Sequence, residues 1–109
     1  MTDKIVVLTT CASESDAERM ARALVEARLA ACVNVVPAVR SFYRWKGAIE
    51  NGQEFLLMIK TSRDLFEALR QEMEKLHPYE VPELLALPVV AGSESYLTWL
   101  QGNLRGAPE

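Results

Sequence analysis

The sequence has few of the residues that cross-link chains or ligate metals. It contains 2 cysteines and 1 histidine among 109 residues. Cys11 and Cys32 form no CxxC pair and have no histidine at zinc-site spacing, so we expect no structural zinc. We expect both thiols to be reduced, because two cysteines in an intracellular chain are seldom bridged.

Long apolar runs and an excess of basic charge are missing as well. The longest apolar run, 84–92, contains Pro88 and is far shorter than the roughly 20 residues that span a bilayer. The first residues are polar and lead directly into a strand-like segment, without the features of a signal peptide. The net charge is -3, and acidic and basic residues are mixed. We therefore expect a cytoplasmic protein with no membrane and no nucleic-acid partner.

Hydrophobic residues, by contrast, are plentiful and make up 50% of the chain. A chain of 109 residues is long enough for one core and too short for two, so we expect a single domain over 1–109. The hydrophobic share is on the high side for a domain of this size. A subunit interface is one use for the surplus.

Apolar periodicity predicts the order β-α-β-β-α-β, followed by a short third helix. Strands are expected at 5–10, 32–46, 55–61 and 84–90, and helices at 17–29, 65–77 and 96–104. This is the split βαβ, or ferredoxin-like, order of an α+β protein, with an antiparallel sheet and both main helices on one face. The fold hosts many functions, so it settles none by itself.

Local signals refine these boundaries. Ser15 and Glu18 have capping-box spacing and predict the start of the first helix. Pro37 predicts a bulge or an edge position within the long second strand, because it has no N–H to donate. Residues 47–52 are predicted to form the turn region between the second and third strands, and Asn51-Gly52 is a strong turn signal within it. Pro78 ends the second helix, since the residue before a proline avoids the helical region.

The length of the second strand indicates a partner. The fifteen residues 32–46 would span roughly 50 Å as a strand, whereas a domain of this size has a radius of gyration of about 13 Å. Part of the ribbon therefore projects and carries Phe42, Tyr43 and Trp45 into solvent. Pairing with identical subunits in a closed ring shields such a ribbon. The alternative is that the strand ends at Pro37 or Ser41 and a loop follows.

Several short motifs stand in order along nearly the whole chain. They are LAACVN at 29–34, SxYxWxG at 41–47, IKT at 59–61, HPYEVPE at 77–83, LPV at 87–89, and Gly92 with Tyr96 and Trp99. Together they resemble the CutA family, the divalent-cation tolerance proteins. The resemblance implies a ferredoxin-like subunit, a stable cytoplasmic homotrimer, and tolerance of divalent metals, copper above all. It also implies a signalling or scaffold role with an unidentified protein partner, no enzymatic activity and no required cofactor.

The resemblance also implies where copper would bind. Some relatives use a cysteine near the end of the first strand, a histidine before the His-Pro-Tyr motif, and the glutamate that closes the motif. Here Thr9 and Leu76 occupy the first two positions, and only Glu83 matches. Cys11 faces the same way as Thr9 on a continuous strand, and His77 is one position from the missing histidine. The predicted ligands of copper or another divalent metal are therefore Glu83, His77 and Cys11.

Other interpretations stay open at this stage. His77 is also placed to bond the last carbonyls of its helix. Cys11 precedes a helix N-terminus, where a lowered thiol pKa would make it reactive. The alternative function is a trimeric, PII-like signalling module that binds a small molecule in clefts between subunits. Such clefts would be lined by tryptophan and tyrosine side chains, including Trp45 and Trp99, which otherwise pack in a core or interface.

Overall fold

A computed structural model describes residues 2–106. The elements follow the predicted order, with a short 3-10 helix before the second α-helix. They are β1 (Lys4–Cys11), α1 (Glu14–Glu26), β2 (Cys32–Trp45), β3 (Ala48–Ser62), the 3-10 helix Arg63–Leu65, α2 (Phe66–Leu76), β4 (Leu85–Pro88) and α3 (Glu94–Gly102). The predicted mixed α+β class is therefore confirmed.

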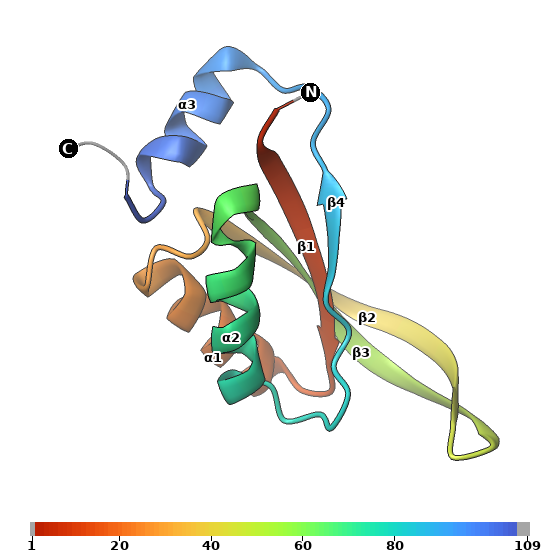
Figure 1. Ribbon diagram of the computed structural model, residues 1–109. Helices are drawn as coiled ribbons and strands as arrows, with labels where there is room; N and C mark the ends of the chain where they lie inside the picture. The colour runs from red at the N-terminus through yellow and green to blue at the C-terminus, as the bar shows by residue number, and fades with distance from the viewer. Residues whose placement is uncertain (1, 107–109) are drawn as a thin grey trace.

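The four strands form one antiparallel sheet in the order β2-β3-β1-β4. Helices α1 and α2 lie along one face of the sheet, and α3 lies near the end of β1 at which the chain starts (Figure 1). Alternation along β1 turns Ile5 and Val7 toward the helices, where they pack in a core with Leu24, Leu57 and Leu69. The intervening residues of β1 point to the other face and are partly exposed.

Helix α1 differs from the prediction at both ends. Ser13, rather than Ser15, caps it, because its extended backbone places its hydroxyl within 3.1 Å of the N–H of Asp16. The helix ends at Glu26 instead of at 29. Arg28 adopts a φ of 58°, which turns the chain off the helix axis and toward β2.

The predicted irregularity in β2 is present. The pairing of β2 with β3 shifts between Val36 and Val39. Pro37 has no N–H for the ladder there, and Ala38 adopts a φ of 63°. This bulge separates the part of β2 that belongs to the sheet from the part that projects.

The hairpin turns at Lys46–Gly47, at the start of the predicted turn region 47–52, and the turn signal at Asn51-Gly52 is wrong. Trp45 pairs with Ala48, which leaves two loop residues with φ of 51° and 82°. Two positive φ values match the twist of a two-stranded ribbon, and glycine adopts one without strain. Asn51 and Gly52 lie inside β3, because cross-strand pairing through them outweighs their local turn preference.

Beyond the bulge, β2 and β3 leave the body of the molecule as a two-stranded ribbon (Figure 1). The chain measures 48 × 26 × 22 Å, and its radius of gyration is 14.6 Å, against about 13 Å for a compact chain of this length. Phe42 and Ile49 on the ribbon are 65% and 70% exposed. The projecting ribbon predicted from the strand length is confirmed, and the loop alternative is wrong.

The last third of the chain returns to the free edge of β1. Helix α2 ends before His77, whose extended backbone satisfies the restriction that Pro78 imposes. Strand β4 is shorter than the predicted 84–90 and ends at Pro88, which offers no N–H to the ladder. Ser93 then caps α3 by accepting a hydrogen bond from a backbone N–H of its first turn.

Candidate functional site

Two of the three predicted metal ligands, Cys11 and His77, lie near the carboxyl end of β1. Cys11 ends β1, His77 follows α2, and Glu83 stands in the loop between α2 and β4. Cys11 and His77 are buried, whereas Glu83 is exposed. Within residues 2–106, no group of three His, Cys, Asp or Glu side chains is arranged to hold a metal ion. The structure brings Cys11 and His77 to one end of the sheet and does not gather all three ligands.

Both ring nitrogens of His77 contact the backbone. Nε2 lies 2.8 Å from the carbonyl oxygen of Thr10, and Nδ1 accepts the N–H of Tyr79 at 3.2 Å. A carbonyl can only accept and an N–H can only donate, so these partners assign a neutral imidazole with its proton on Nε2. The imidazole lone pair is thus engaged by Tyr79. His77 bonds the end of β1 and fastens the loop after α2 to it.

Cys11 is a buried thiol whose Sγ lies 3.6 Å from the carbonyl oxygen of Ser13. Burial raises the pKa of this thiol, and the charges of Asp16 and Glu54 raise it further. A lowered pKa, expected from the nearby helix N-terminus, is therefore wrong, and desolvation by burial is the largest cause of the rise. The thiol is protonated at neutral pH, so a metal ion would have to displace its proton.

A second pair of residues fastens the same loop from the other side. The hydroxyl of Tyr79 donates a hydrogen bond of 2.6 Å to the carboxylate of Glu54, which is only 9% exposed. Burial and this carboxylate raise the pKa of Tyr79. Glu54 was not among the residues predicted for this site. The available signal was a single acidic residue directly before the apolar run 55–59, where a strand leads into the core.

Thr9 stands where copper-binding relatives were expected to carry a cysteine. Its side chain is fully buried, and its hydroxyl is the one buried side-chain polar atom without a hydrogen-bond partner among residues 2–106. A buried unpartnered hydroxyl destabilises the fold. The position therefore carries a polar group that the single chain does not use.

The aromatic residues predicted to line a cleft fall into two groups. On α3, the rings of Tyr96 and Trp99 lie 5.5 Å apart, and the ammonium of Lys60 lies 3.4 Å from the Tyr96 hydroxyl. Tyr43 and Trp45 belong to the ribbon, which extends from the opposite end of the molecule (Figure 1). The single chain does not bring the two groups together.

The fold and this site define a class: a small α+β protein in which buried ionisable side chains fasten a loop to the sheet. A model of the family described as CutA1 divalent ion tolerance protein matches residues 5–103. The chain therefore belongs to the CutA1 divalent ion tolerance family. The resemblance stated from the sequence motifs is confirmed.

Individual relatives are similar over nearly their whole length. The divalent-cation tolerance protein CutA of Thermus thermophilus is 51% identical over 98 residues, which cover 90% of this chain and 95% of the relative. That of Pectobacterium atrosepticum is 44% identical, with 94% of each chain covered. The crystal structure of CutA from Xylella fastidiosa is 41% identical, covers 94% of this chain and 99% of that one, and superposes with a TM-score of 0.92.

Relatives in this family carry the names of different compartments. An Arabidopsis thaliana relative that is 42% identical is called chloroplastic, and this chain covers 56% of it. An Archaeoglobus fulgidus structure that is 36% identical is called periplasmic. In the part of this chain that the structure describes, no helix has the length and apolar character needed to cross a membrane.

Proposed function

We propose that this chain works as a cytoplasmic homotrimer of ferredoxin-like subunits in the tolerance of divalent cations. In this trimer, the sheet face opposite α1 and α2 forms the contact between copies. The observation that carries the proposal is the apolar character of that face, called the open face below. Its apolar members are Val6, Leu8, Val36, Leu56, Met58, Leu85 and Leu87, and the polar residues Thr10, Asn34 and Lys60 share the same face.

Strand pairing defines the open face. Leu8 is paired with Met58 on one side and with Leu85 on the other, and directly opposed residues share a face of a sheet. Leu85 and Leu87 are 57% and 47% exposed in the single chain. Each large apolar side chain left in water forgoes roughly 1.5–3 kcal/mol of burial, so covering this face stabilises the protein.

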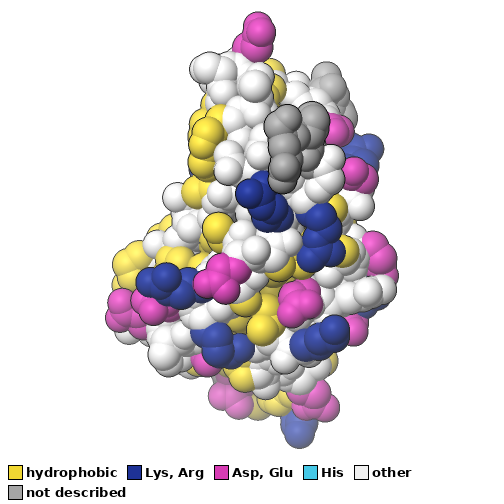
Figure 2. Space-filling view, turned by 90° about the vertical axis from the view of Figure 1, so that its left-hand side faces the viewer, with side chains coloured by type: hydrophobic (Ala, Val, Ile, Leu, Met, Phe, Trp, Pro, Cys, Tyr) yellow, Lys and Arg dark blue, Asp and Glu magenta, His cyan; other side chains and the backbone are white. Residues whose placement is uncertain are grey.

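The helical face has the opposite character. In Figure 2, basic and acidic side chains are interspersed over the side of the molecule that the helices form. Several of them pair along one helix, as Arg22 does with Glu18 and as Arg70 does with Glu67. Mixed charges of this kind suit a surface in contact with water. The contrast indicates that copies associate through the open face.

The edges of the sheet also favour a ring of copies. β2 and β4 are the outer strands, so each has one side without a neighbour in the described chain. Exposed edges favour pairing with another chain, and a head-to-tail contact that closes into a ring leaves no edge free. The ribbon and β4 are two different surfaces of one copy, as a head-to-tail contact between copies requires.

The mass of the native particle tests the trimer. Light scattering and native mass spectrometry are expected to give three times the 12.2 kDa of one chain at micromolar concentration. A stable, non-aggregating particle of 12.2 kDa would contradict the proposal, because the open face would then be in water.

The second part of the proposal is that the chain binds a divalent metal ion weakly. In the arrangement described here, His77 has no available lone pair, the Cys11 thiol is protonated, and Glu83 is separate, so these residues do not fit a copper ion as they stand. Binding at them would replace existing hydrogen bonds. We therefore expect any metal binding at these residues to be weak.

Calorimetry with Cu(II) and with Zn(II) tests the metal contact. The native protein is expected to show weak binding that Cys11→Ser and His77→Gln reduce and that Cys32→Ser, the matched cysteine control, leaves unchanged. Heat no larger than that of buffer controls would eliminate a direct metal role. Equal effects of Cys11→Ser and Cys32→Ser would show that the metal does not bind at Cys11.

The cytoplasmic setting is supported by the state of the thiols. Cys11 and Cys32 are both free, which suits a reducing compartment. Fractionation of cells that express the chain from its own locus is the test. Recovery with a periplasmic or organelle marker would contradict this part of the proposal without affecting the trimer.

A further inference from the structure

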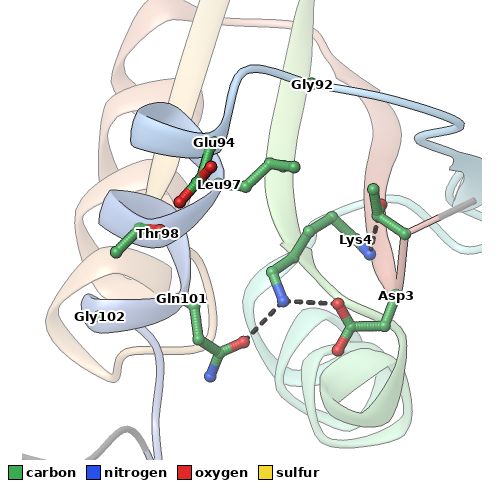
Figure 3. A pocket seen from close by; sticks show the side chains of 9 residues that line it. Asp3, Lys4, Gly92, Glu94, Leu97, Thr98, Gln101 and Gly102 are labelled. Atoms are coloured by element: carbon green, nitrogen blue, oxygen red, sulfur yellow. Dashed lines mark hydrogen bonds and ion pairs between the residues drawn. The ribbon is translucent and has the colours of Figure 1, made fainter.

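A hollow lies between the start of β1 and α3, at the opposite end of β1 from Cys11. Its volume is about 650 Å³, within the range of small-molecule sites. Asp3 and Lys4 line one side, and Glu94, Leu97 and Gln101 of α3 line the other (Figure 3). These residues belong neither to the site at Cys11 and His77 nor to the surface in the proposed function.

A buried lysine stands in this hollow. Lysines are almost never fully buried without a partner, yet Lys4 is only 5% exposed. Its ammonium donates to Oδ1 of Asp3 at 2.7 Å and to Oε1 of Gln101 at 2.6 Å (Figure 3). An ammonium has three N–H donors, and these two bonds are the ones it makes within residues 2–106. One donor is left for a ligand.

Gln101 supplies a second donor beside the first. Because its Oε1 accepts from Lys4, the orientation of the amide is fixed, and its NH₂ group makes no hydrogen bond with residues 2–106. Two N–H donors, one of them charged, therefore stand next to each other. Such a pair suits the two oxygens of a carboxylate.

The charge of the hollow excludes a simple anion. Asp3 and Glu94 bring two carboxylates against the single ammonium of Lys4. The Lys4 ammonium lowers the pKa of Asp3, so this carboxylate is ionised at neutral pH. A free carboxylate ligand would be repelled, and a free amine would leave the buried donors unused. A ligand that carries both a carboxylate and an ammonium pairs with the basic side of the hollow and with its acidic side.

The floor between these charges is apolar and small. Leu97 extends from α3 toward β1, and a Cβ on Gly92 would stand 3.1 Å from its side chain, so only glycine leaves Leu97 in place. We propose that the hollow binds a free α-amino acid with a compact apolar side chain. Its carboxylate contacts Lys4 and Gln101, its ammonium contacts Glu94, and its side chain packs on Leu97.

Calorimetry on the full chain tests this site with three ligands of one shape. Leucine is expected to bind, while leucinamide, which lacks the carboxylate, and 4-methylpentanoate, which lacks the ammonium, bind at least about tenfold more weakly. Equal binding of the three ligands, or no heat with leucine at millimolar concentration, would overturn the proposal.

A matched pair of variants locates the binding. Glu94→Gln removes the proposed ammonium contact from an exposed position and is expected to weaken leucine at least about fivefold. Glu26→Gln makes the same change on α1 and leaves leucine binding unchanged. Equal effects of the two variants, or none from Glu94→Gln in a protein with native circular dichroism, would rule out this hollow.

Discussion

Tyr79 donates a hydrogen bond of 2.6 Å to the carboxylate of Glu54, 25 positions earlier in the chain. Together with the bond from His77 to the carbonyl of Thr10, it holds the loop after α2 against the end of β1. A loop fastened at two points carries Val81 and Glu83 outward in a defined position. The pair thus links the core of the subunit to a surface that other copies or ligands would meet.

Removing the Tyr79 hydroxyl is expected to destabilise the protein by about 1–3 kcal/mol. In Tyr79→Phe, the Glu54 carboxylate stays buried and loses its donor, and an unpartnered buried charge is expensive. Urea unfolding at one fixed protein concentration measures the loss. The control is Tyr96→Phe, an exposed hydroxyl near Lys60, for which less than about 0.5 kcal/mol is expected. Equal losses in the two variants would show that the Glu54 contact contributes nothing specific.

The same bond predicts a loss of stability at high pH. The pKa of Tyr79 is higher in the folded protein than the value of about 10 in an unfolded chain. Its contribution is therefore complete below about pH 10 and is lost as the pH rises further, because the unfolded chain then releases the proton first. Unfolding free energies at about pH 8 and about pH 11 should differ less in Tyr79→Phe than in the native protein. An identical pH dependence in both proteins would contradict the assignment.

Thr9→Val is expected to stabilise the protein by about 1 kcal/mol. The two side chains have the same shape, and the change removes a buried hydroxyl that has no partner among residues 2–106. Thr61→Val is the matched comparison, because the Thr61 hydroxyl is equally buried and donates to the carbonyl of Leu29 at 2.7 Å. A loss of about 1 kcal/mol is expected there. Thermal unfolding measures the stability of the two variants. A loss of stability in both would mean that the Thr9 hydroxyl has a hydrogen-bond partner in the assembled protein.

Alanine substitutions at two glycines test the position of the hairpin turn. Gly47 has a φ of 82°, so Gly47→Ala is expected to cost about 1–2 kcal/mol. Gly52 has no such φ and no atom within 4 Å of an added Cβ, so Gly52→Ala should change stability by less than about 0.5 kcal/mol. Chemical denaturation measures both. A larger loss of stability in Gly52→Ala than in Gly47→Ala would instead place the hairpin turn at the Asn-Gly pair.

One apolar-to-charged substitution on each face tests which surface associates. Leu87 on the open face and Val25 on α1 are 47% and 42% exposed, so in a lone chain Leu87→Glu and Val25→Glu would be tolerated alike. The proposed trimer predicts that Leu87→Glu lowers the native mass toward that of one chain, because the new charge would be buried against another copy. Val25→Glu should leave the mass unchanged. Loss of assembly from Val25→Glu alone would assign the contact to the helical face.

Much of the fold could be predicted because its signals are local. The bulge at Pro37 follows from a missing N–H, and the end of α2 follows from the steric effect of Pro78. The errors arose where two local signals compete. Ser13 and Ser15 both carry a hydroxyl near the start of α1, and the extended backbone at Ser13 makes Ser13 the cap while Ser15 lies within the first turn.

The candidate site was less predictable. His77 and Cys11 were found from their residue types and from the family motif, and the structure places both near the end of β1. Their chemistry was not predictable, because it depends on burial and on backbone partners. The metal assignment to these residues and to Glu83 stays a prediction, since the single chain uses the imidazole lone pair for Tyr79.

The sequence by itself determined the order of elements, the projecting ribbon and membership of the CutA1 divalent ion tolerance family, because periodicity, proline sterics and short motifs are written along the chain. The tertiary structure alone decided which polar groups meet. Glu54 reaches Tyr79, and Lys4 reaches Gln101 across 97 positions, only after the sheet has formed and the later loops have packed on it. Such contacts depend on the path of the whole chain, and no local pattern specifies that path.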